Sequence, residues 1–354
     1  MEFHNKPQTG GSFVYHERND RSLLMLFLQV VIKPFRPRLA SPSKLPPNAE
    51  RLTPPKNARK CHIEERVLEE LWLYDITRES DGSYDREPCP PRRRRILYFA
   101  GGGWQMPPSK NHWTFCMELV RRLDNTAVTI ISAPLAPKHP VSVAFPRIQR
   151  AYRSLLNESH DAGERVIVAG DSSGGNIALS LVAWTLKHPK SEVLNPPVAV
   201  MAISPTVDLR HELPQIRVVE KSDALHTFES IKATAEAWCP EETTTESSKI
   251  SQPDRGDSHG CSDWGLDDPR VSPIHADLGV FVQHNVHIYG VTGSYDVLAP
   301  EAVAFRNKCR EHGVSGEWLS WERQMHCFPL MFKYGLKEGK EGTDWIIRVL
   351  DKHP

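Results

Sequence analysis

The stretch Arg-Val-Ile-Val-Ala-Gly-Asp-Ser-Ser-Gly-Gly-Asn, residues 165–176, decides the fold. Arg165 to Ala169 has the apolar character of a buried β-strand, and a helix is expected from Asn176 to Leu186. Between them lies Gly-x-Ser-x-Gly centred on Ser172, the pattern of a sharp strand-to-helix turn that lifts a serine hydroxyl above a sheet. Glycine suits the flanking positions because bulkier residues clash in so strained a turn. A plain glycine-rich turn is the alternative, and the strand and helix on either side disfavour it.

A second glycine-rich turn lies upstream. The apolar strand predicted at Ile96 to Phe99 runs through Ala100 into Gly101, Gly102 and Gly103. Such a loop can offer backbone N–H groups to an oxyanion, because no side chain blocks the approach. A phosphate-binding loop is the alternative interpretation. It is disfavoured because the loop lacks the Gly-Lys-Ser/Thr ending and Gly-x-Gly-x-x-Gly does not occur.

An acid and a base follow two later strands. Asp296 comes just past the apolar strand predicted at Val286–Val291, and His326 just past the strand predicted at Glu317–Trp321. A single histidine among 16 would carry little weight. The order serine, aspartate, histidine is the one expected when the serine occupies such a turn. The sequence therefore predicts a triad in which His326 takes the Ser172 proton and Asp296 orients His326.

Apolar strands alternate with amphipathic helices along the chain, which predicts an α/β fold with a mostly parallel sheet covered on both faces. Further strands are expected at Val67–Ile76, Ala127–Ser132 and Val198–Ile203. Further helices are expected at Trp113–Leu123, Ile148–Leu156, Ile231–Trp238, Pro300–His312 and Trp345–Leu350.

Two segments break this alternation. Residues 1–60 read as an N-terminal arm, because prolines from Pro34 to Pro55 are too dense for a regular helix or central strand. The apolar run Leu23–Ile32 within the arm could pack on the core, form part of a cap, or dip into a membrane surface. Residues 61–354 form the main domain, interrupted by an insertion at about 208–265. Its polar tract, residues 241–257, is expected to be a mobile surface loop.

Composition limits the function further. The 44 basic residues balance 44 acidic ones, so nothing favours nucleic acid or a strongly charged substrate as a partner. The basic run Arg92–Arg95 could meet an anionic surface, but the balanced net charge favours a solvated strand entrance. Seven cysteines, an odd number without a Cys-x-x-Cys pair, indicate reduced thiols and a cytoplasmic location. The pairs Cys61-His62 and His259-Gly260-Cys261 lack a partner pair at ligand spacing, so no metal site is expected.

The N-terminus predicts neither export nor a membrane anchor. Its first residues are polar and lack the features of a secretory signal. The run Leu23–Ile32 is too short to cross a bilayer, which takes about 20 residues. No integral membrane segment is therefore expected.

These motifs resemble the hormone-sensitive-lipase family of α/β-hydrolases. That family typically shows His-Gly-Gly-Gly, Gly-Asp-Ser-Ala-Gly-Gly, Asp-x-Leu and His-Gly-Phe. This chain has Ala100-Gly-Gly-Gly, Gly170-Asp-Ser-Ser-Gly-Gly, Asp296-Val-Leu and His326-Cys-Phe. Two supporting segments, residues 135–140 and 268–273, are also similar. The resemblance runs from about residue 90 to the C-terminus.

The resemblance implies a serine esterase that needs no cofactor and acts on small to medium uncharged esters. It places the oxyanion donors at the N–H groups of Gly102, Gly103 and Ser173, and a cap at residues 1–60 and about 208–265. Ala100 replaces a histidine that usually helps to hold the oxyanion loop, so the loop could either be looser or be held by another residue, such as Trp104. Two enzymatic alternatives share the triad: an amide or carbamate hydrolase, and a natural-product tailoring hydrolase. A further, non-enzymatic alternative is a catalytically inactive binding protein with the same fold.

Overall fold

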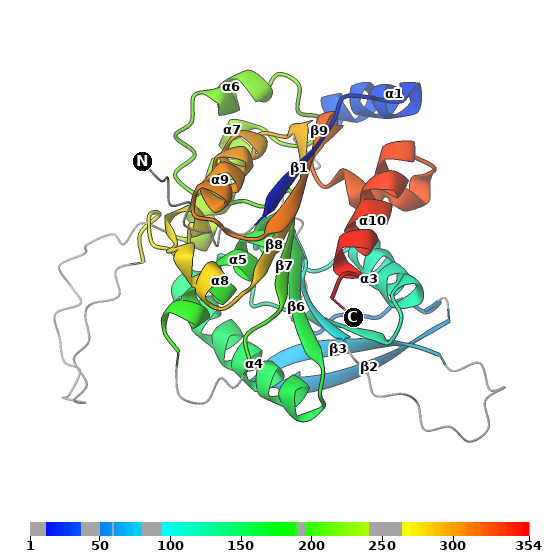
Figure 1. Cartoon of the computed structure of the whole chain (residues 1–354). Coiled ribbons are helices and arrows are strands. Elements are labelled where there is room, and N and C mark those ends of the chain that lie inside the picture. The colour runs from blue at the N-terminus through cyan, green and yellow to red at the C-terminus, as the bar shows by residue number, and fades with distance from the viewer. Residues whose placement is uncertain are drawn as a thin grey trace, which may run out of the picture.

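The computed structural model describes residues 12–36, 50–58, 60–79, 94–189, 195–240 and 264–353. Within them lies a nine-stranded sheet with the order β1-β9-β8-β7-β6-β4-β5-β3-β2 (Figure 1). β3 runs antiparallel to β2 and β5, and the remaining neighbours are parallel. The predicted mostly parallel sheet is therefore confirmed.

In chain order the strands are β1 (Phe13–Arg18), β2 (Cys61–Leu68), β3 (Leu71–Arg78), β4 (Arg94–Phe99), β5 (Thr126–Ile131), β6 (Arg165–Asp171), β7 (Ala199–Ile203), β8 (His287–Tyr295) and β9 (Gly316–Met325). The α-helices are α1 (Leu23–Ile32), α3 (Lys110–Arg122), α4 (Val141–Asp161), α5 (Ser173–Lys187), α6 (Gln215–Val219), α7 (Phe228–Trp238), α8 (Gly279–Gln283), α9 (Ala299–Glu311) and α10 (Lys337–Leu350). The short 3-10 helices are η1 (Lys33–Phe35), η3 (Pro273–His275) and η4 (Phe328–Tyr334).

Helices cover both faces of the sheet. α4, α5, α8 and α9 pack on one face, and α3 and α10 on the other (Figure 1). The central strand β6 serves both layers, because successive side chains of a strand point to opposite faces. Val166 and Val168 join the first core, and Ile167 and Ala169 join the second. This double burial explains why β6 reads as an unbroken apolar run.

The strand predicted at Val67–Ile76 is wrong as a single element. The chain turns there, so that β2 and β3 form a hairpin in which Leu68 pairs with Leu71. The two turn residues, Glu69 and Glu70, both have positive φ, 48° and 65°. Such turns usually carry asparagine or glycine, so a Glu-Glu pair gives no turn signal.

The predicted N-terminal arm contributes a strand to the sheet. Phe13–Arg18 forms β1, which pairs in parallel with Gly316–Trp321 of β9 and adds a strand to the edge of the sheet. Phe13 and Tyr15 pack against the core from this edge. A short strand with mixed polar residues, far in sequence from its partner, leaves no local pattern that would reveal the pairing.

The two described residues of the basic run, Arg94 and Arg95, begin β4 and do not form a solvated strand entrance. Arg94 is 1% exposed, and its Nε donates to the carbonyl of His353 at 2.8 Å. Arg95 donates to the carboxylates of Asp75 at 2.9 Å and Glu164 at 2.5 Å. These partners, distant in sequence, hold Arg95 and the Nε of Arg94, whereas the buried Nη1 of Arg94 has no hydrogen-bond partner in the described chain.

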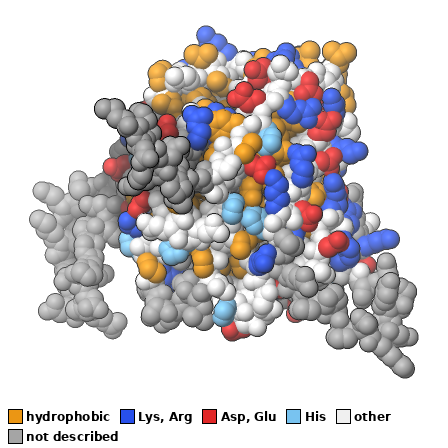
Figure 2. All heavy atoms as spheres, in the orientation of Figure 1, with side chains coloured by type: hydrophobic (Ala, Val, Ile, Leu, Met, Phe, Trp, Pro, Cys, Tyr) orange, Lys and Arg blue, Asp and Glu red, His pale blue; other side chains and the backbone are white. Residues whose placement is uncertain are grey.

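Helix α1 buries only one side of its largely apolar surface. Met25 and Gln29 are buried, whereas Leu23 is 83% and Phe27 65% exposed. Hydrophobic side chains gather at the upper right of the space-filling view, where α1 lies (Figure 2). Elsewhere on this face, acidic and basic side chains are interspersed. Within the described ranges, every helix is too short or too polar to cross a bilayer.

The predicted polar tract at residues 241–257 lies outside the described residues. The other predicted helices and strands occur, with boundaries shifted by a few residues in most cases. The two largest shifts are at helix starts: α10 begins at Lys337 rather than Trp345, and α4 begins at Val141 rather than Ile148 and includes Pro146. Pro146 explains why the predicted start of α4 is too late, because a proline usually limits a helix.

Candidate active site

Ser172 occupies the turn between β6 and α5. Its backbone lies at φ 53° and ψ −122°, a conformation that costs a side-chain-bearing residue about 1–3 kcal/mol. The flanking glycines make the turn possible. A Cβ on Gly170 would lie 2.3 Å from the carbonyl oxygen of Gly174, and one on Gly174 would lie 2.0 Å from that of Phe99. The expected strand-to-helix turn is therefore present, with α5 beginning at Ser173.

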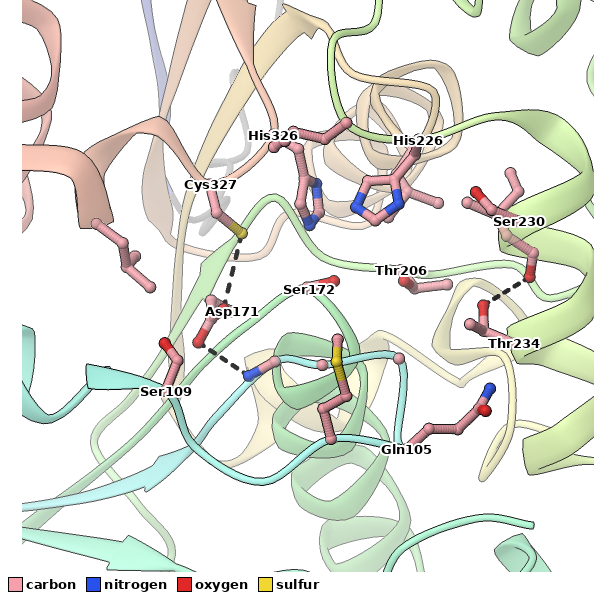
Figure 3. Close-up of a pocket in the computed structure, with 18 of the residues that line it drawn as sticks. Gln105, Ser109, Asp171, Ser172, Thr206, His226, Ser230, Thr234, His326 and Cys327 are labelled. Carbon is pink, nitrogen blue, oxygen red and sulfur yellow. Dashed lines mark hydrogen bonds between the residues drawn. The ribbon is translucent and has the colours of Figure 1, made fainter. Parts of the chain in front are cut away.

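Asp296 and His326 lie at the carboxyl ends of β8 and β9. His326 Nδ1 and Asp296 Oδ2 are 2.8 Å apart, and the two side chains are 7% and 0% exposed. Ser172 and His326 line the same cavity, with His326 on one side of Ser172 and the loop that carries Gln105 on the other (Figure 3). The structure thus brings the three predicted residues together where the parallel strands end.

The loop after β4 faces Ser172 from the opposite side. Gly102 and Gly103 line the cavity and have positive φ, 139° and 59°. Within the described chain their N–H groups have no hydrogen-bond acceptor, which leaves them available to an oxyanion. Ser173 begins α5, so its N–H is one of the unpaired donors of the helix N-terminus. This arrangement supports the predicted donor set.

Trp104 holds this loop in the absence of the family histidine. Its indole stacks on Trp238 of α7 with ring centroids 5.5 Å apart and planes 10° from parallel. Its backbone N–H donates to Ser173 Oγ at 3.2 Å, and its carbonyl accepts from Ala136 at 2.9 Å. The loop is therefore anchored to α5, to α7 and to residue 136, although position 100 is alanine.

Asp171, the residue before the serine, provides a second anchor that sequence reasoning missed. Its carboxylate accepts hydrogen bonds from the hydroxyl of Tyr98 at 2.6 Å and the N–H of Gly101 at 3.1 Å, and lies 3.1 Å from His112 Nε2. Burial would raise the pKa of Asp171, but the charge of His112 and these hydrogen bonds lower it below its usual value. A buried carboxylate thus ties β4, the glycine loop and α3 to the serine turn.

Ser204 and Asp223 position the other half of the site. Ser204 Oγ accepts the N–H of Cys327 at 3.0 Å, next to His326. Asp223 is fully buried, and it accepts the N–H groups of His226 at 2.9 Å and Val297 at 2.8 Å. It therefore connects the segment before α7 to the loop that carries Asp296. Burial and the charge of Asp296 raise the pKa of Asp223 to about 6.

Two segments of the predicted cap contribute to the cavity. Ile32 comes from α1, and Ile231 and Thr234 from α7. Arg36, just after η1, donates to the carbonyls of Glu220 at 2.9 Å and Asp223 at 3.0 Å. The N-terminal segment is thereby fastened to the chain between α6 and α7.

The pKa of His326 lies well above its usual value of 6.5. Burial alone would lower it, but the adjacent Asp296 carboxylate stabilises the imidazolium and outweighs burial. His226 packs edge to face on His326, with ring centroids 4.8 Å apart. Burial, with the charge of His326, lowers the pKa of His226 to about 3, so this second ring stays neutral.

The acid limb of the pH–activity profile should therefore have its midpoint above pH 6.5. If His326 accepts the Ser172 proton, as the sequence predicts, it must be unprotonated, and activity is then lost as pH falls through its raised pKa. The measurement is kcat/KM for an ester substrate against pH, corrected for spontaneous hydrolysis. A midpoint at or below pH 6.5 would contradict the raised pKa, and His226 cannot supply the limb because it titrates far lower.

Comparisons with known proteins agree with this geometry. A family model described as the alpha/beta hydrolase fold matches residues 96–330. An esterase from Acinetobacter venetianus is 26% identical over 241 residues, which cover 66% of this chain and 69% of the relative. Esterase LipU from Mycobacterium tuberculosis is 28% identical over 247 residues, covering 69% and 73%.

A solved structure described as a hormone-sensitive lipase from a metagenome library matches with a TM-score of 0.71 and 19% identity, covering 94% of this chain and 99% of that one. The chain therefore belongs to the α/β-hydrolases of the hormone-sensitive-lipase family. The predicted family and fold class are confirmed.

Proposed function

We propose that this chain hydrolyses small to medium uncharged carboxylic esters through Ser172, His326 and Asp296. The coarser conclusion, that it is a carboxylic ester hydrolase, follows from its family and from relatives that are named esterases. The observation that carries the finer proposal is the convergence of a strained serine turn, a hydrogen-bonded histidine–aspartate pair and two free glycine N–H groups on one cavity.

In the proposed reaction, Ser172 Oγ attacks the ester carbonyl while His326 Nε2 removes its proton. Asp296 accepts the Nδ1–H of His326, fixes the tautomer and stabilises the imidazolium. His326 then protonates the leaving alcohol oxygen as the tetrahedral intermediate collapses to an acyl-enzyme. Water, deprotonated by His326, releases the acid and restores the Ser172 hydroxyl.

The N–H groups of Gly102, Gly103 and Ser173 would stabilise the negative oxygen of both tetrahedral intermediates. Each donor is worth about 3–4 kcal/mol in such a site. Backbone donors suit this task because the glycine loop is held by Asp171 and Trp104 before substrate arrives. The donors therefore need little reorganisation during the reaction.

The size of the cavity supports the proposed substrate range. Its volume is about 480 Å³, in the lower half of the roughly 300–1,000 Å³ typical of small-molecule sites. We propose that α1, α6 and α7 form the cap, within the predicted cap segments 1–60 and 208–265.

The five described cysteines are unpaired, which supports a reducing, cytoplasmic location.

A series of p-nitrophenyl esters from acetate to palmitate tests this proposal. We expect kcat/KM to be highest for short and medium acyl chains and to fall at long ones, because the capped cavity cannot enclose a long chain. A maximum at palmitate would contradict the size limit. A lack of hydrolysis across the whole series would favour an inactive binding protein or an amide-directed enzyme.

A further inference from the structure

A buried histidine–glutamate pair borders the same cavity and has no part in the proposed reaction. His211 follows β7 and lines the cavity, although its residue exposure is only 4%. Its Nδ1 lies 3.0 and 3.2 Å from the two carboxylate oxygens of Glu301 on α9. Glu301 is 0% exposed. Placing such a pair out of water is costly, and stability alone rarely explains it.

The backbone at His211 is also unusual. Its φ is 53°, in the left-handed region that residues with a side chain seldom occupy. The loop that carries it begins beside the serine turn, since the N–H of Thr206 donates to the carbonyl of Ser172 at 3.3 Å and Thr206 lies close to Ser172 (Figure 3). A strained loop that starts at the nucleophile and ends in a buried, paired histidine indicates a role at the site.

The pairing determines what the imidazole offers to the cavity. The two nitrogens lie on different edges of the ring, and Glu301 occupies Nδ1, so Nε2 is left without a partner in the described chain. A buried pair favours zero net charge. Two arrangements satisfy this condition: imidazolium with carboxylate, or a neutral imidazole whose Nδ1 accepts from a protonated Glu301. Both place a proton on Nε2, so His211 presents a hydrogen-bond donor.

We propose that His211 is a specificity residue whose Nε2–H binds an oxygen acceptor in the substrate, away from the ester bond being cleaved. The favoured substrates are then esters that carry a second uncharged oxygen function, such as a ketone or an ether, rather than plain alkyl esters. Ile231 and Leu298, buried apolar residues that line the same cavity, lower its polarity and would strengthen such a contact. This inference rests on the proposed esterase function.

Matched ester pairs test the preference for oxygen. On the acyl side, p-nitrophenyl 4-oxopentanoate is compared with p-nitrophenyl pentanoate. On the alcohol side, 2-methoxyethyl butyrate is compared with butyl butyrate. We expect kcat/KM to favour the oxygen-bearing ester in one pair by roughly threefold to tenfold, the value of one hydrogen bond. Equal rates in both pairs would overturn the proposal.

Two substitutions separate recognition from structure. His211→Asn places an amide N–H near Nδ1, tolerates positive φ and lacks the Nε2 donor, so the oxygen preference should vanish. His211→Gln places an amide N–H near Nε2 and should keep part of it. For each ester pair, the ratio of the two kcat/KM values in the variant is divided by the same ratio in the wild type. Intrinsic substrate reactivity and any general loss of activity then cancel. A preference that survives His211→Asn would contradict the proposal.

Binding separates this inference from the proposed function. In a Ser172→Ala background, calorimetry with the intact 2-methoxyethyl and butyl esters and with both p-nitrophenyl esters should show the same preference without turnover. If the chain hydrolysed no ester but this preference depended on His211, the proposed reaction alone would fail. If esters were hydrolysed without any His211-dependent preference, the specificity role alone would fail.

Discussion

Replacing Ser172 by alanine should lower kcat for p-nitrophenyl butyrate by roughly 10³-fold or more. The substitution removes the attacking oxygen and leaves the oxyanion donors and the cavity in place. Alanine and serine both carry a Cβ, so the backbone strain at φ 53° is similar in the two proteins. The unfolding temperature should therefore stay close to that of the wild type. The measurements are steady-state kinetics and thermal unfolding of both proteins.

Covalent labelling gives this prediction a second readout. A fluorophosphonate probe should react with the wild type at Ser172 and fail to label Ser172→Ala. Ser230→Ala is the matched control, because Ser230 contributes a second hydroxyl to the same cavity (Figure 3) and labelling should persist without it. A fall in kcat of less than about tenfold, or labelling at another serine, would be incompatible with Ser172 as the nucleophile.

Asp171→Ala should damage both stability and catalysis. It leaves the hydroxyl of Tyr98, the ring of His112 and the N–H of Gly101 buried without their acceptor, and such an unpaired cluster costs about 3–5 kcal/mol of unfolding free energy. The glycine loop loses an anchor, so the proposed oxyanion donors should shift and kcat should fall by about 10²-fold. Urea unfolding and ester kinetics measure the two effects.

Asp171→Asn separates charge from shape. Asparagine keeps an oxygen that can accept from Gly101 and Tyr98, but it no longer stabilises the charge that His112 carries when protonated. We expect losses between those of the wild type and Asp171→Ala. If Asp171→Ala unfolded at the wild-type urea concentration and kept more than half of kcat, the carboxylate would not hold the oxyanion loop.

The parts of the site that could be predicted share one property: each lies next to a strand that the sequence reveals. Ser172, Asp296 and His326 follow apolar runs, and chain order links them before any contact is known. The glycine triplet is visible for the same reason. Parallel strands bring their carboxyl ends together, so position along the chain is enough to predict convergence.

The missed residues depend on contacts between distant segments. His112 is one of 16 histidines, and only its approach to Asp171 distinguishes it. Arg95 reads as a solvated charge until Asp75 and Glu164 are placed beside it. His211 is missed because the signals that matter, a positive φ and a glutamate ninety positions away, leave no trace in local spacing.

Strand β1 has a consequence beyond its contribution to the sheet. β9 spans ten residues, and its fully buried Trp318 and Trp321 belong to opposite cores. Without β1, one side of β9 would present a row of unpaired N–H and C=O groups, a template on which another chain could add a strand and start aggregation. β1 pairs with Gly316–Trp321 and presents in their place a six-residue edge that carries His16, Glu17 and Arg18, charged and polar side chains that discourage such pairing. β1 therefore shields the paired part of β9 from another chain, a role separate from any contribution of the N-terminal segment to the cavity around Ser172.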